Sequence, residues 1–216
     1  MPRLDPSALP NIITVARILV TPAIFALTFA RGFWPGMLNF VLFLAAAISD
    51  LWDGHLARKN NWVSDFGKFW DPVADKLLVI VTFIPFYILS HRPGTVGDLP
   101  YLGELPGWIL LVVFGREVIV TAIRSVAARR GVVIPAGSAG KRKAVFQNIF
   151  VGSVLFWYAI QDGARAHGWS GDMFAALEIF NTIVCIVSLT IAVVLTVWSM
   201  GVYLWNWRTL MRRISV

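Results

Sequence analysis

The chain has 216 residues, of which 57% are hydrophobic and only 14% are charged, and its mean hydropathy is +0.70. This composition lies outside the range of soluble domains and predicts an integral membrane protein. The net charge of +7 comes from basic residues beside apolar segments, so the expected partners are membrane lipids or a phosphorylated substrate, and not nucleic acid. The one cysteine, Cys185, excludes an internal disulfide and a cysteine-based zinc cluster.

Six apolar segments of about 20 residues follow one another, and a helix of this length crosses a bilayer core. They are expected at residues 12–30, 36–56, 71–89, 107–128, 144–160 and 174–205. No small-residue cleavage site follows the first segment, which predicts a retained helix and not a signal peptide. The fold class predicted for residues 1–216 is therefore a single all-α integral membrane domain with six transmembrane helices.

The basic residues predict the orientation of these helices. Only Arg31, Arg92 and Arg165 lie in the loops after the first, third and fifth segments, whereas most other basic residues lie at the opposite membrane face. Because basic residues concentrate on the cytoplasmic side, both termini are expected in the cytoplasm. The expected location is a bacterial cytoplasmic membrane, with the acidic residues of the second and third segments at its cytoplasmic face.

Four aspartates lie at the ends of the second and third segments. Asp50 and Asp53 have i, i+3 spacing and Asp71 and Asp75 have i, i+4 spacing, so each pair lies on one helix face. Carboxylates beside hydrocarbon are unfavourable without counter-ions, and an all-oxygen cluster suits hard divalent cations. The sequence therefore predicts an Mg2+ or Mn2+ site, with two ions expected, whose ligands are Asp50, Asp53, Asp71 and Asp75.

Residues suited to a nucleotide lie among these aspartates. Gly54 and Gly67 leave the backbone open to a bulky ligand, and Ala57 is small enough for the same purpose. Arg58 presents a planar guanidinium that pairs well with phosphate oxygens. Asp75, the last carboxylate of the run, is expected to be both a metal ligand and a general base.

Residues 50–75 resemble the signature of the CDP-alcohol phosphotransferases. The order Asp-x2-Asp-Gly-x2-Ala-Arg-x8-Gly-x3-Asp-x3-Asp is filled at every defining position. The resemblance implies a CDP-activated lipid as donor, an alcohol as acceptor, CMP as leaving group and a homodimeric protein. It also implies that Asp75 deprotonates the acceptor hydroxyl, which then attacks the lipid-side phosphorus.

Further stretches within residues 9–160 are similar to one branch of this family, the phosphatidylglycerophosphate synthases. They begin at Pro10, Asp71, Gly115 and Gly140. This similarity implies transfer of a phosphatidyl group from CDP-diacylglycerol to glycerol 3-phosphate, giving phosphatidylglycerol phosphate and CMP. One position departs from the pattern, because Ala144 stands where this branch commonly has threonine.

A phosphorylated acceptor requires cations near the metal site. Arg116 lies near the middle of the fourth segment and Arg124 lies two turns nearer the cytoplasm, and both are expected to contact the acceptor phosphate. Lys141 and Lys143 would close the same pocket. The alternatives are a structural ion pair between Arg116 and Glu117 or a neighbouring helix, and an anionic-lipid anchor made by the two lysines.

The first segment carries a polar stripe in which Asn11, Thr14 and Arg17 recur every third residue. Asn11 and Thr14 are expected to face the nucleotide. In the alternative interpretation, Asn11 caps the helix and the side chain of Arg17 extends to the membrane interface.

Three other functions are compatible with the acidic cluster. The same chemistry with inositol phosphate as acceptor would use the same cationic pocket, whereas phosphatidylglycerol, the acceptor in cardiolipin synthesis, would need a wider cleft for lipid. A divalent cation transporter is the more remote alternative. Its carboxylates would lie nearer the bilayer midplane, and Arg58 would repel the transported ion.

Overall fold

The computed structural model describes residues 9–60, 65–92, 99, 102–129 and 138–214. This part of the chain forms six helices. In chain order they are α1 (Leu9–Thr28), α2 (Phe33–Asn60), α3 (Asp65–Ser90), α4 (Gly107–Arg129), α5 (Ser138–His167) and α6 (Asp172–Ile214). The prediction of an all-helical protein with six successive helices is confirmed.

Several helices extend beyond the apolar segments that predicted them. The candidate spans Phe69–Ser90 and Arg142–His167 begin near the expected Asp71 and Ala144, whereas the helices α3 and α5 begin earlier, at Asp65 and Ser138. The apolar length of a sequence marks only the part of a helix that suits hydrocarbon, and the helix itself continues into polar surroundings. Asp71 therefore lies inside α3, and Asp50 lies well before the end of α2.

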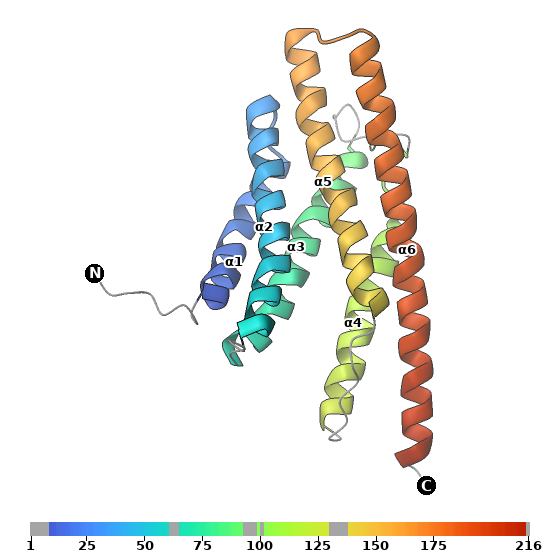
Figure 1. The fold of residues 1–216 in the computed structure, drawn as a ribbon. Coiled ribbons are helices and arrows are strands. Elements are labelled where there is room, and N and C mark those ends of the chain that lie inside the picture. The colour runs from blue at the N-terminus through green and yellow to red at the C-terminus, as the bar shows by residue number, and fades with distance from the viewer. Residues whose placement is uncertain (1–8, 61–64, 93–98, 100–101, 130–137, 215–216) are drawn as a thin grey trace, which may run out of the picture.

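Five of the described helices have the length and composition needed to cross a membrane: α1, α2, α3, α5 and α6. α4 has 23 residues but carries charges along its length, among them Arg116, Glu117 and Arg124. Its assignment as a sixth span stays a prediction. α1 begins and α6 ends toward the same end of the bundle, the lower end in Figure 1. The assignment of this end of the bundle to the cytoplasmic face of the membrane also stays a prediction.

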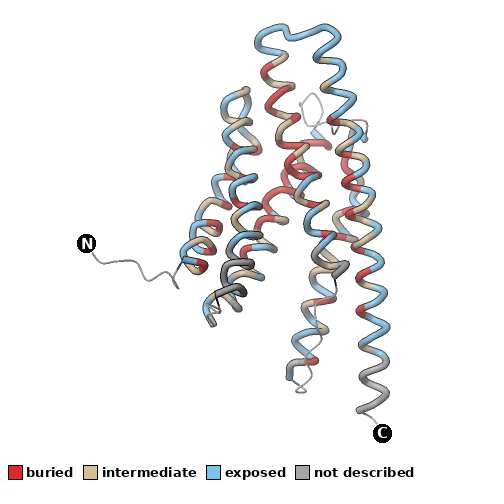
Figure 2. Tube along the Cα trace, viewed as in Figure 1, coloured by how far each residue is buried: buried red, intermediate tan, exposed pale blue. Residues whose placement is uncertain are grey.

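The helices form two groups that are joined through α2 and α5. α1 packs against α2 and α3, while α6 packs against α4 and α5, and α5 also packs against α2. α3 and α4 have little contact, and the two groups diverge toward the lower end of the bundle (Figure 1). Buried residues are frequent along α5, at the centre of the bundle (Figure 2). The aromatic part of this core consists of Phe43, Phe83, Phe86 and Phe150.

α2 and α5 approach each other closely at Gly36. A Cβ atom on Gly36 would lie 2.9 Å from both the Cα and the Cβ of Ala159, which is closer than packed atoms allow. Nearby, the backbone N–H of Gly32 donates to Oδ2 of Asp162 on α5 at 2.7 Å. Gly32 has a φ of 111°, which residues other than glycine rarely adopt. Two glycines thus dock the start of α2 on α5 and fix how the two helix groups meet.

We predict that Gly36→Ala destabilises the protein by about 1–3 kcal/mol, because the new methyl group cannot fit without moving backbone. Gly201→Ala is the matched control, since nothing lies within 4 Å of an added Cβ there and alanine favours a helix. The measurement is the midpoint of thermal unfolding in detergent. Equal midpoints for the two variants would contradict the proposed close contact.

Candidate active site

Three of the predicted metal ligands line one cavity between the two groups of helices. Asp50 on α2 and Asp71 and Asp75 on α3 line this cavity, whose volume is about 1200 Å3. The surface that these three residues form is called the acidic wall below. The side chains of Asp50 and Asp75 are 33% and 55% exposed, so each has oxygen atoms accessible from the cavity. Residues of α4, α5 and α6 complete its lining.

Helix α1 binds the same carboxylates. The side chain of Arg17 is 1% exposed, and its Nη1 donates to Oδ1 of Asp50 and, at 3.1 Å, to Oδ1 of Asp75. The alternative in which Arg17 extends to the membrane interface is therefore wrong. The hydroxyl of Thr14 donates to Oδ1 of Asp71 at 2.6 Å. A contact between Thr14 and a nucleotide stays a prediction.

The role of Arg17 is the main feature of the acidic wall that the sequence interpretation missed. The available signal was an arginine within an apolar segment, one turn from Thr14 on the same helix face. A charge in such a segment is expensive unless an opposite charge meets it. The sequence could not show which acidic residues those were, because the partners lie on two other helices.

Some of the other predicted site residues lie outside the described part of the structure. Four lie in the later turns of α2, and their side chains are outside the described part of the structure: Asp53, Gly54, Ala57 and Arg58. Gly67 in the first turn of α3 and Asn11 in the first turn of α1 are half-buried. Their predicted contacts with a metal or nucleotide stay predictions.

The acidic wall fits a divalent cation by its ligand type. Asp50, Asp71 and Asp75 present carboxylate oxygens, which Mg2+ and Mn2+ prefer, to one shared cavity. Among the side chains that the structure describes, no three acidic, histidine or cysteine groups stand close enough to hold an ion as they are. Arg17 binds two of these carboxylates, and Thr14 binds the third. The metal site remains a prediction that rests on the donor set.

Another wall of the cavity is basic. Arg116 and Arg124 of α4 and Lys143 of α5 line it. Glu117 accepts hydrogen bonds from Nη1 of Arg116 at 3.0 Å and from Nζ of Lys143. The ion pair offered as an alternative for Arg116 is thus confirmed. Lys143 is only 5% exposed, so a lipid-anchoring role for it is wrong, whereas the side chain of Lys141 lies outside the described part.

The pairing with Glu117 does not remove these cations from the cavity. One carboxylate faces two cations, so the cluster keeps a net positive charge. Nε of Arg116 is buried and has no hydrogen-bond partner among the described groups. A Cβ atom on Gly140 would come within 3.3 Å of Nη2 of Arg116, so the glycine leaves room for the guanidinium.

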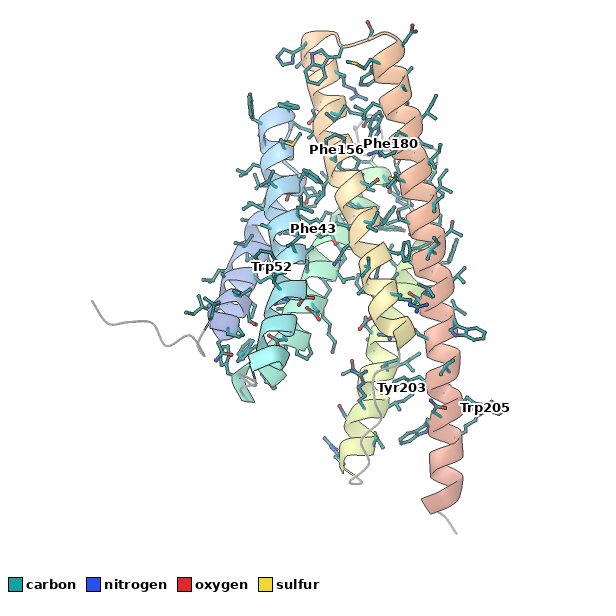
Figure 3. All side chains as sticks on the ribbon, in the orientation of Figure 1. Phe43, Trp52, Phe156, Phe180, Tyr203 and Trp205 are labelled. Carbon is teal, nitrogen blue, oxygen red and sulfur yellow. The ribbon has the colours of Figure 1, made fainter. Side chains whose placement is uncertain are left out.

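Arg124 is held by a residue that the sequence interpretation did not single out. Its Nε donates to the hydroxyl of Tyr203 at 2.8 Å, and its guanidinium carbon lies 5.5 Å from the centre of the Tyr203 ring. Tyr203 lies on the side of α6 that faces α4 (Figure 3), and it is 6% exposed. Nothing in the sequence signalled this contact, because Tyr203 is one of several hydroxyl-bearing residues in its segment, among them Thr196 and Ser199.

The cavity also has an apolar region between α2, α5 and α6. Phe43 of α2, Phe156 of α5 and Phe180 of α6 lie around it (Figure 3). The cavity therefore joins a charged region to an apolar one within a single space. Such an amphipathic lining suits a ligand with a polar headgroup and a hydrocarbon chain.

A family model described as CDP-alcohol phosphatidyltransferase matches residues 7–205 of the chain. The chain belongs to this family. The matched region extends through α6 to Trp205, beyond the residues 9–160 on which the sequence resemblance rested. The family assignment made from the aspartate signature is confirmed.

The chain is also similar to curated proteins that are named as phosphatidyltransferases or as a cardiolipin synthase. The chain is 33% identical over 177 residues to the CDP-diacylglycerol–glycerol-3-phosphate 3-phosphatidyltransferase of Rickettsia typhi, covering 82% of this chain and 91% of the relative. It is 32% identical over 209 residues to enzyme 1 of the same name from Arabidopsis thaliana, covering 94% of this chain and 64% of the relative. A CMP-forming cardiolipin synthase of Oryza sativa subsp. japonica is 34% identical over 120 residues, covering 56% of this chain and 36% of the relative.

We predict that Glu117→Gln lowers the free energy of unfolding by about 1–3 kcal/mol, because two largely buried cations lose their shared carboxylate. Glu104→Gln is the control: its side chain is 70% exposed and it pairs with His91 across 3.5 Å, where little stability is at stake. Thermal unfolding in detergent measures both. A Glu117 variant no less stable than the Glu104 variant would contradict the structural role of the cluster.

Proposed function

We propose that this protein transfers a phosphatidyl group from CDP-diacylglycerol to glycerol 3-phosphate and releases phosphatidylglycerol phosphate and CMP. Membership of the CDP-alcohol phosphatidyltransferase family supports the donor class. The names of relatives that cover most of the chain support the acceptor. The single observation that carries the proposal is the cavity, because its acidic, basic and apolar regions match the three chemical parts of this reaction.

The donor has an apolar tail and a pyrophosphate, and the cavity offers a place for each. Its acyl chains would lie in the apolar region near Phe43 and Phe156, and its pyrophosphate near Asp50 and Asp71. Divalent ions bound at the acidic wall would neutralise the pyrophosphate and polarise the phosphorus under attack. We propose that the nucleotide part of the donor contacts the residues predicted from the sequence: Gly54, Ala57, Arg58, Gly67, Asn11 and Thr14.

The acceptor carries a phosphate at one end and a free hydroxyl at the other. Arg116, Arg124 and Lys143 supply three cations in one wall of the cavity, and we propose that they hold this phosphate, with Lys141 beside them. A held phosphate directs the hydroxyl toward Asp75, which takes its proton. The acceleration of the reaction then has two sources. The protein holds the two substrates in a reactive orientation, and its charged groups are already placed to stabilise the transition state.

The proposed active site faces the cytoplasm. The end of α4, the start of α5 and the end of α6 lie toward the same end of the bundle (Figure 1) and carry Arg129, Arg142 and Arg208. Basic residues favour the cytoplasmic face, so both termini are assigned to it. The homodimer implied by the resemblance and the expected location in a bacterial cytoplasmic membrane are part of the same proposal.

The acceptor is tested by CMP release from CDP-diacylglycerol by the purified protein in detergent with Mg2+. Glycerol 3-phosphate, inositol phosphate and phosphatidylglycerol are offered in parallel, and EDTA serves as the metal-free control. Release with glycerol 3-phosphate alone supports the proposal. Release only with phosphatidylglycerol would assign the chain to the chemistry of the cardiolipin synthase it matches over 56% of its length. No release with any acceptor would contradict the enzyme assignment.

We predict that Asp75→Asn lowers turnover by about 100-fold or more, because an amide cannot accept the hydroxyl proton. Binding of the donor nucleotide, measured with a radiolabelled CDP-diacylglycerol, should change far less. Asp172→Asn is the control, since Asp172 lies in the exposed first turn of α6. Full activity of the Asp75 variant would contradict its role as base.

We predict that Arg124→Ala raises the KM for glycerol 3-phosphate about tenfold and leaves the KM for the donor nearly unchanged, because it removes a charge-assisted contact to the acceptor phosphate. Arg129→Ala, an exposed arginine at the end of the same helix, is the matched control. Steady-state kinetics with each substrate varied in turn gives both constants. A rise confined to the donor KM would place Arg124 at the nucleotide.

A further inference from the structure

Helix α1 connects the two helices that carry the acidic wall. α1 packs against both α2 and α3. Thr14 and Arg17 lie one turn apart on α1. Thr14 donates a hydrogen bond to Asp71 of α3. Arg17 donates to Asp50 of α2 and to Asp75 of α3. α1 therefore fixes how the carboxylates of two different helices stand relative to one another.

The guanidinium of Arg17 lies behind these carboxylates, and the cavity lies in front of them. Arg17 is almost fully buried, whereas the side chains of Asp50 and Asp75 keep 33% and 55% of their surface exposed. A buried charge near hydrocarbon is costly unless it is paired, and here two carboxylates pair with it. In turn, the positive charge of Arg17 reduces the repulsion between the carboxylates of Asp50 on α2 and Asp75 on α3.

The contacts of Arg17 use the same carboxylates that a divalent ion would use. Nη1 of Arg17 binds Oδ1 of Asp50 and Oδ1 of Asp75. An ion that binds these carboxylates from the cavity meets a fixed positive charge at contact distance from its ligands. In surroundings of low dielectric constant this repulsion is strong.

We propose that Arg17 is a built-in counter-cation that competes with the divalent ion for Asp50 and Asp75. It stabilises the joined acidic helices when no ion is bound, and it weakens the binding of the ion when one arrives. Arg17 is thus a positioning residue for the acidic wall, acting from behind it. This inference rests on the proposed use of a divalent ion at these carboxylates.

The sign of each effect follows from linkage. Removing the charge of Arg17 leaves two carboxylates facing one another, so the ion-free protein loses stability. The same change removes the competitor, so the ion binds more tightly and restores much of that loss. A residue with a purely structural role behaves differently, because its removal lowers stability by the same amount with and without the ion.

The test compares wild-type protein with Arg17→Gln, both full-length in detergent, using Mn2+ alone as probe. Thermal unfolding is measured in EDTA and in saturating Mn2+, and Mn2+ binding is measured by the electron paramagnetic resonance signal of the free ion. We expect a lower midpoint in EDTA, a much smaller loss in Mn2+, and a Kd for Mn2+ lowered about tenfold. Thr21→Val is the control, since Thr21 is buried on α1 and its hydroxyl donates to the backbone carbonyl of Arg17 at 2.8 Å.

Equal losses of stability in EDTA and in Mn2+, or weaker Mn2+ binding by Arg17→Gln, would overturn the competition while leaving the metal site intact. Wild-type protein that binds no Mn2+, or binds it equally well after Asp50→Asn, would overturn the metal site and this inference together. If Arg17→Gln does not fold even in Mn2+, Arg17→Lys replaces it. A lysine bridges the two carboxylates less well, so a loss confined to EDTA supports the proposal and an equal loss overturns it.

Discussion

The ion pairing of Arg17 with Asp50 and Asp75 is the interaction on which the rest of the site depends. Carboxylates from two helices are brought to one cavity wall, and their charges would drive the helices apart without a cation. An arginine buried on a third helix supplies that cation from inside the protein. The cavity side of the carboxylates stays open, so the same arrangement that stabilises the fold also leaves ligands for an ion.

The charge distribution around the cavity separates two tasks. Acidic residues line the part built from α2 and α3, and a cluster with net positive charge lines the part built from α4 and α5. In the proposed reaction, a metal-bound pyrophosphate and an anionic acceptor would therefore have distinct places, although both carry phosphate groups. The apolar region near Phe43 and Phe180 provides a third place that suits hydrocarbon. The sharing of one cavity by all three places makes a lipid-modifying reaction the natural interpretation.

The sequence predicted the six helices from the length of its apolar segments, and it predicted the pairing of aspartates on one helix face from their spacing, because both are local features. Asp71 and Asp75 could be assigned to one helix face from their spacing alone. The partners of Arg17 and the contact of Arg124 with Tyr203 could not be predicted, because they depend on how distant helices pack. The first turns of α3 and α5 lay outside the predicted spans, since helices begin before the apolar residues that identify them.

The most direct test is a structure of the protein with Mn2+ and CDP-diacylglycerol, with the ion located by its anomalous X-ray scattering. The account predicts Mn2+ among the carboxylates of Asp50, Asp71 and Asp75, the pyrophosphate beside it, and the acyl chains near Phe43 and Phe156. Mn2+ bound away from these aspartates, or a donor lying outside the cavity, would contradict it.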